Sequence, residues 1–178
     1  MKKVAAICAA IMVLSVVVAY AAWMGNKNHH CQVRIPDGWN TEYQVMVKED
    51  GKQAHIITGL DNEANPTMVA AIVSMELAET IDLKLFKDFF EKNILKDPVV
   101  VESQKRGFNN LKGIYVIYEA NFGGKPFRLM CFFTKHDCDP KECKGTYFYA
   151  VFTGAEKDKF DEAKPKLDEL LVTFNYVP

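Results

Sequence analysis

Residues 114–134 read IYVIYEANFGGKPFRLMCFFT, and they establish the type of sheet that this chain forms. The first half is rich in isoleucine, valine and tyrosine, which favour β-strands, and Gly123-Gly124 suits the tight turn of a hairpin. Segments 114–122 and 127–134 are therefore predicted to pair as antiparallel strands. Both are apolar on both faces, which is typical of central strands covered on both sides.

Further strands are predicted on either side of this hairpin. Alternating or continuous apolar residues mark the segments 31–35, 43–48, 55–58, 68–75, 99–103 and 147–153. Turn sequences border these strands at Pro36-Asp37-Gly38, Asp50-Gly51 and Asn109-Asn110. The chain is therefore dominated by short strands with turns between them.

Two segments change to the period of a helix. Between residues 82 and 95, apolar side chains recur three or four residues apart, and we expect Thr80 to cap this helix. A second helix is predicted at 157–171, where Pro165 should produce a kink or begin a new helix. This order predicts an α+β domain at 31–178, with an antiparallel sheet flanked by helices in a single α/β/α-type sandwich.

The N-terminus has the features of an export signal. Two lysines precede an apolar run that extends from residue 4 to residue 22, and Ala19-Tyr20-Ala21 has the small-x-small pattern that signal peptidase accepts. Residues 1–21 are therefore interpreted as a signal peptide. The run is also long enough for a retained membrane anchor, so both fates stay open. Residues 22–30 are interpreted as a polar leader.

This interpretation predicts a periplasmic or secreted protein, or one anchored in the inner membrane with its domain facing outward. The whole chain has a formal charge of −1, and loss of Lys2 and Lys3 changes it to −3. Such mild acidity gives no electrostatic reason to expect nucleic acid as a partner. A membrane is expected as a partner only if the N-terminal segment is retained.

The chain resembles the PsbP-like superfamily, which includes the DcrB-like bacterial envelope proteins. The resemblance is carried by Val33-Arg34-Ile35-Pro36-Asp37-Gly38-Trp39, by residues 113–118, by the Gly123-Gly124 hairpin, by residues 147–153, and by Phe160, Ala163, Pro165, Leu167, Leu170, Leu171 and Phe174. It implies an antiparallel sheet between helices and a non-enzymatic binding or assembly role. The ion-binding and docking residues of the photosynthetic members have no matching motif here.

Four cysteines follow the signal, and they allow three pairings. Cys138 and Cys143 lie in one polar loop between two strands, and an oxidising compartment favours a disulfide that closes this loop. Cys31 and Cys131 form the other candidate pair. Cys131 lies within an apolar strand, where a buried free thiol is the alternative.

A metal site is the competing interpretation of the loop at 135–144. His136, Cys138 and Cys143 are potential zinc ligands, with Cys31, His29 or His30 as a fourth. The paired spacing that is usual in zinc sites is absent, and exported thiols oxidise readily. The alternative function is therefore a metal- or small-ligand-binding envelope protein.

Catalytic motifs are absent from the sequence. The mature part has two serines, Ser74 and Ser103, and neither lies in Gly-x-Ser-x-Gly. No histidine is paired with a serine or carboxylate in a recognised motif, and there is no phosphate-binding glycine loop. We therefore expect no enzymatic activity and no cofactor.

The leading hypothesis is a non-catalytic exported module of the bacterial cell envelope that binds an unidentified protein partner. Trp39, which follows a turn, is a candidate contact residue, and Tyr147 or Tyr149 could reach the surface beside it. The other aromatic residues are expected to form the core.

Overall fold

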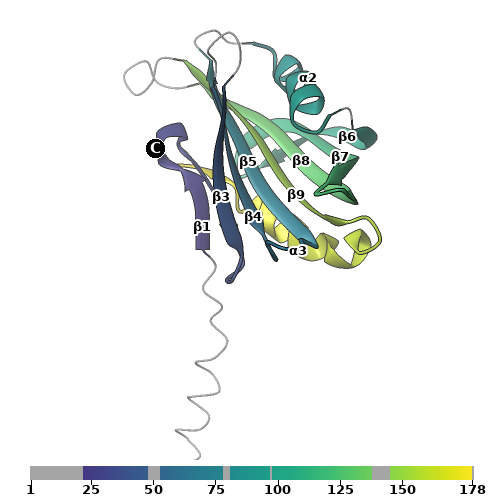
Figure 1. Cartoon of the computed structure of the whole chain (residues 1–178). Helices are drawn as coiled ribbons and strands as arrows, with labels where there is room; N and C mark the ends of the chain where they lie inside the picture. The colour runs from purple at the N-terminus through teal and green to yellow at the C-terminus, as the bar shows by residue number, and fades with distance from the viewer. Residues whose placement is uncertain (1–21, 48–52, 78–80, 97, 138–144, 178) are drawn as a thin grey trace, which may run out of the picture.

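The computed structural model describes residues 22–47, 53–77, 81–96, 98–137 and 145–177. Its largest element is an antiparallel seven-stranded sheet with the order β3-β4-β5-β9-β8-β7-β6 (Figure 1). The strands are β3 (Asn40–Val47), β4 (Gln53–Leu60), β5 (Met68–Leu77), β6 (Val99–Phe108), β7 (Leu111–Phe122), β8 (Lys125–Asp137) and β9 (Thr146–Glu156). Every strand predicted from the sequence is confirmed, and most extend beyond their predicted ends.

A second, three-stranded sheet has the order β1-β2-β10. It contains β1 (Ala22–Asn26), β2 (Cys31–Ile35) and β10 (Asn175–Tyr176), and the 3-10 helix η1 (Lys27–His29) connects β1 to β2. The predicted polar leader at 22–30 is therefore wrong. Met24 is only 3% exposed and belongs to the core, and Gly25 packs so closely on β2 that a Cβ there would lie 2.4 Å from the Cys31 carbonyl oxygen.

The large sheet separates two cores because alternate side chains of a strand point to opposite faces. On β8, Met130 and Phe132 join the core beneath α3 (Phe160–Val172) and the small sheet. Cys131 and Phe133 join the core beneath α2 (Leu83–Asn93). The α+β class and the antiparallel sheet are confirmed. The predicted α/β/α sandwich holds only in part, because the chain is strongly β-rich: one face of the large sheet carries a helix alone, and the other carries a helix with a small sheet.

Both helices differ in detail from the prediction. The N-cap of α2 is Asp82, whose carboxylate accepts a hydrogen bond from the backbone N–H of Lys84 at 2.7 Å; the predicted cap, Thr80, lies outside the described residues. Pro165 lies inside α3, which begins at Phe160 and runs through it as one helix. No helix within the described ranges has the length and apolar character needed to cross a membrane. The predicted export signal lies outside these ranges.

The turns on either side of β7 form at residues whose type favours a left-handed backbone. Gly123 and Gly124 have φ angles of 58° and 81°, a left-handed conformation that glycine adopts without steric cost. Asn109 and Asn110 have φ angles of 47° and 66°, which asparagine tolerates better than most residues. The two predicted turns before and after β7 are therefore confirmed.

Candidate functional site

All four histidines of the chain lie at one end of the large sheet. The rings of His29 and His55 contact each other edge to face, with 4.1 Å between centroids. His136 stacks on Tyr176 at 3.7 Å, and Tyr176 lies 5.6 Å from His30. These residues come from η1 and its flank, β4, β8 and β10, so the small sheet and the large sheet together form the cluster.

Hydrogen bonds attach η1 to the sheet beneath it. The Nδ1 atom of His29 lies 2.8 Å from the Ser74 hydroxyl, and the Tyr149 hydroxyl donates to the His29 carbonyl at 2.8 Å. The Tyr147 hydroxyl donates to the Asn28 carbonyl at 3.2 Å. On the exposed side, the Tyr43 hydroxyl is hydrogen-bonded to Nδ1 of His55. These contacts hold the N-terminal segment on the large sheet.

The pKa shifts of the buried groups in this cluster agree with a structural role for it. Burial is the largest of the effects that lower the pKa of His29 to about 4, and the neighbouring His55 and His30 contribute the rest of the decrease. Burial also lowers the pKa of His55, and it raises the pKa of the Cys31 thiol to about 12. At neutral pH the imidazoles of His29 and His55 are therefore uncharged, and Cys31 remains a thiol rather than a reactive thiolate.

Of the two predicted disulfides, the structure describes the cysteines of only one, Cys31 with Cys131. Cys31 and Cys131 are both free and buried. They belong to the cores on opposite faces of the large sheet. The predicted pairing of these two residues is therefore wrong. Cys138 and Cys143 lie outside the described residues, so their disulfide stays a prediction.

The structure brings only some of the predicted metal ligands close to one another. The rings of His136 and His30 both lie near Tyr176, with 3.7 Å and 5.6 Å between centroids. Within the described ranges, no group of three or more His, Cys, Asp or Glu side chains could hold a metal ion. Two of the proposed ligands, Cys138 and Cys143, fall outside those ranges.

The predicted surface aromatics are mostly interior. Tyr147 and Tyr149 are buried, at 4% and 1% exposure, and they serve as hydrogen-bond donors to the η1 segment. Trp39 is partly buried and packs against the core beneath α3. A Cβ on Gly59 would lie 3.4 Å from its ring, so this indole rests on the backbone of β4. None of the three forms an exposed aromatic patch.

A groove lies at the opposite end of the sheet, where α2 ends and the β7–β8 hairpin turns. Its volume is about 580 Å³, and we call it the α2 groove. It is lined by Ile94, Leu95, Lys96, Pro98, Val99, Glu119, Ala120, Asn121, Phe122, Gly123, Pro126, Phe127 and Lys157. Its volume is within the range of sites that bind small molecules or side chains of a partner.

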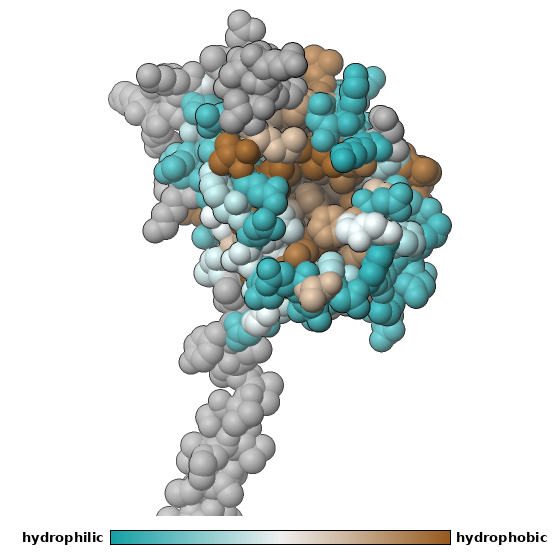
Figure 2. Space-filling model, viewed as in Figure 1, coloured by the Kyte–Doolittle hydropathy of each residue, from teal (hydrophilic) through white to brown (hydrophobic). Residues whose placement is uncertain are grey.

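The walls of the α2 groove combine apolar and polar side chains, which contribute about equally to its exposed surface. Ile94, Leu95 and Phe122 are partly buried residues that pack on the core beneath α2 while remaining accessible. Figure 2 shows that apolar residues also reach the surface elsewhere on this face, in a hollow below the helix with polar residues around it. The short helix α2 thus covers only part of the apolar face of the sheet.

Ion pairs form one side of the α2 groove. The Glu119 carboxylate accepts hydrogen bonds from Lys157 at 2.7 Å and from Arg128 at 2.8 Å, and these two bonds lower its pKa. The same lysine lines a neighbouring hollow of about 700 Å³ with Arg128 and Asp161. The charged side chains at this end are therefore held in position by their neighbours.

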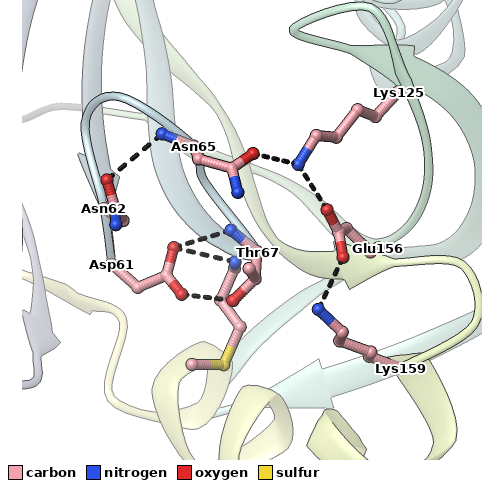
Figure 3. A network of polar contacts seen from close by, with 8 residues as sticks. Asp61, Asn62, Asn65, Thr67, Lys125, Glu156 and Lys159 are labelled. Atoms are coloured by element: carbon pink, nitrogen blue, oxygen red, sulfur yellow. Dashed lines mark hydrogen bonds and ion pairs between the residues drawn. The ribbon is translucent and has the colours of Figure 1, made fainter.

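A second polar network fixes the adjacent loop (Figure 3). Lys125 binds Glu156 at 2.6 Å and also contacts the Asn65 side chain, which belongs to the turn between β4 and β5. Within that turn, the Asp61 carboxylate accepts bonds from the backbone N–H groups of Thr67 and Met68. Burial alone would raise the pKa of Asp61, but these hydrogen bonds outweigh it and lower the pKa.

The α2 groove escaped the sequence analysis because its residues come from three separate segments. The apolar residues at the end of α2 belong to the helix predicted at 82–95, where their period alone does not distinguish a groove wall from a core face. Neither Glu119 nor Lys157 lies in a motif, and their contact spans 38 residues of sequence. The one available indication is an acidic residue, Glu119, within the mostly apolar segment 114–122.

The fold is similar to that of solved proteins. Cyanobacterial PsbP (CyanoP) from Synechocystis sp. PCC 6803 has a TM-score of 0.57 at 12% identity, over 90% of this chain and 95% of that chain. PA94 from Pseudomonas aeruginosa, a protein of unknown function, has a TM-score of 0.46 at 13% identity, over 89% and 98% of the two chains. LpqN from Mycobacterium tuberculosis, involved in cell envelope biogenesis, has a TM-score of 0.43 at 13% identity, over 80% and 87%.

The comparison with CyanoP confirms the predicted PsbP-like resemblance at the level of the fold. This similarity rests on the structural comparison alone. No protein-family model matches the chain, and a search of curated proteins finds no match either.

Proposed function

Starting from the PsbP-like fold, we propose that this protein is a non-catalytic binding module of the bacterial cell envelope. The α2 groove would be the surface that contacts its protein partner. The predicted export signal supports the location, and the fold supports a role in binding, although proteins of one fold can serve different partners.

One observation carries the proposal: an open groove with apolar residues in its walls lies directly beside charged side chains that hydrogen bonds hold in place. Apolar walls provide the energy of association because they lose contact with water, and fixed charges at the edge select the partner. Glu119 is fixed by Lys157 and Arg128, so it needs little reorganisation when a partner binds. Lys96 lines the same groove, and within the described residues it has no ion-pair partner.

Site-specific photo-crosslinking in the cell envelope tests the proposal. A photoreactive amino acid replaces Asn121, an exposed residue that lines the α2 groove, and the matched control carries it at Lys166, an exposed residue of α3. We expect one discrete adduct at 121 and none at 166. Excess unlabelled protein should prevent the adduct, whereas excess Lys96→Glu protein should compete at least about tenfold less well because its groove charge is reversed.

Two results would contradict this function. Equal labelling at both positions would mean that the α2 groove does not recognise a partner. Turnover of a substrate that Lys96→Glu abolishes would mean that the groove is catalytic. Circular dichroism of both labelled proteins controls for folding.

A further inference from the structure

Strand β6 forms one edge of the large sheet and pairs only with β7 among the described strands. All of its residues except Phe108 are exposed. Val99, Val100 and Val101 are 64%, 49% and 51% exposed, although valine usually occurs inside proteins. An open edge with consecutive apolar residues is a surface on which another strand can pair.

The two charged residues on the face of β6 that carries Gln104 are arranged symmetrically about it. Glu102 precedes it by two residues and Arg106 follows it by two. Gln104 donates a hydrogen bond to Glu102 at 3.0 Å, so these two side chains share a face. The Arg106 guanidinium lies over the rings of Phe108 and Tyr115, 4.6 Å and 5.2 Å from their centroids. Both rings belong to the core beneath α3, so all three polar residues lie on that face.

We propose that β6 pairs antiparallel with β6 of a second copy of this chain, about a two-fold axis through Gln104. The two large sheets would then join into one. In this register each Gln104 faces the other, and Glu102 of each copy faces Arg106 of the other copy. Glu102 and Arg106 would thus form two ion pairs across the interface, while Lys105 lies on the other face of the strand and faces Ser103.

Strand geometry leaves few alternative registers. When two sheets join edge to edge about a two-fold axis normal to the sheet, residues directly opposite each other lie on the same face. Centring on Ser103 would place Glu102 opposite Gln104, and centring on Lys105 would place the two lysines opposite each other. Only the Gln104 register pairs Glu102 with Arg106. The irregularity between Val100 and Glu102 lies outside the Glu102–Arg106 segment.

Sedimentation velocity across a concentration series measures the association. We expect the unmodified protein to dimerise at concentrations up to about 100 μM. Glu102→Arg places like charges opposite each other twice and should raise the dissociation constant about tenfold or more. Glu102→Arg combined with Arg106→Glu exchanges the two charges and should restore the dimer. A monomer at all concentrations, or a double variant no better than the single one, would overturn the proposal.

A cysteine crosslink tests the register independently. Gln104→Cys brings two thiols opposite each other across the axis, so mild oxidation should yield a disulfide-linked dimer. Ser103→Cys is the matched control, because residue 103 would face Lys105 of the second copy, and it should crosslink far less. The parent chain shows the background from its native cysteines. Equal yields from the two variants, or crosslinking of residue 104 to a different protein, would contradict self-pairing.

Discussion

The buried residue His29 makes the stability of the fold depend on pH. Its folded-state pKa is about 4, whereas the unfolded side chain has the ordinary value of 6.5. Between these values the unfolded chain binds a proton that the folded chain does not. Stability is therefore complete above about pH 6.5 and decreases as the pH falls toward 4. We expect His29 to account for about 1–2 kcal/mol of this loss, after allowance for partial solvent screening.

Urea unfolding at pH 7, 5 and 4 measures this effect. His29→Gln retains an amide that can bond to Ser74 but cannot titrate, so the variant should lose less stability than the unmodified protein between pH 7 and pH 4. His55, whose pKa is also lowered, leaves a residual pH dependence in both proteins. Parallel pH profiles would show that His29 is not the titrating group.

At the scale of single residues, the sequence predicts features that depend on local backbone conformation, but not contacts between distant segments. Gly123 and Gly124 were assigned to a turn because of their own backbone freedom, and the structure agrees. The contact of His29 with Ser74 spans 45 residues, and it depends on how β1 and β2 are placed over β5. The incorrect pairing of Cys31 with Cys131 has the same cause, because sequence does not show which face of the sheet each thiol meets.

At the scale of elements, α2 contributes to stability through two side chains. Phe86 and Phe90 are fully buried, and Phe90 meets Phe133 and Phe152 edge to face. Phe90→Ala should lower the free energy of unfolding by about 3–5 kcal/mol, because it removes the buried ring and leaves a cavity. Leu85→Ala, on the exposed side of the same helix, should change it by less than about 0.5 kcal/mol. Urea denaturation of both variants checks this, and equal losses would mean that α2 does not pack on the sheet as described.

Elements with a strong period were predictable, and those without one were not. The apolar stripe of α2 and the continuous apolar runs of β5 and β9 identified these segments from the sequence. Strand β1 was missed because it has five residues with a glycine among them, too few for a period to show. It forms a strand because β2 supplies hydrogen-bonding partners along its whole length. The α2 groove was missed for a related reason, since its walls meet only after the sheet has formed.

At the scale of the whole molecule, the small sheet determines whether the core beneath α3 is closed. Met24 of β1 is buried in this core, and Tyr147 and Tyr149 donate hydrogen bonds to the following η1 segment. Removal of these residues would expose the apolar side chains of β2 and leave two buried hydroxyls without partners. The segment is therefore part of the folding unit, although its composition is that of a linker.

A comparison of chains that begin at residue 22 and at residue 31 tests this conclusion. We expect the shorter chain to be less stable by about 3 kcal/mol or more, since the loss of Met24 burial costs about 2 kcal/mol and each lost hydrogen bond about 1 kcal/mol. Trp23→Ala in the longer chain is the control, because Trp23 is 57% exposed and its loss should change stability little. Thermal and urea unfolding with equal midpoints for the two chains would mean that residues 22–30 do not contribute to the core. A large loss in the shorter chain would show that the domain begins before Cys31, since the core beneath α3 would then depend on residues that precede it.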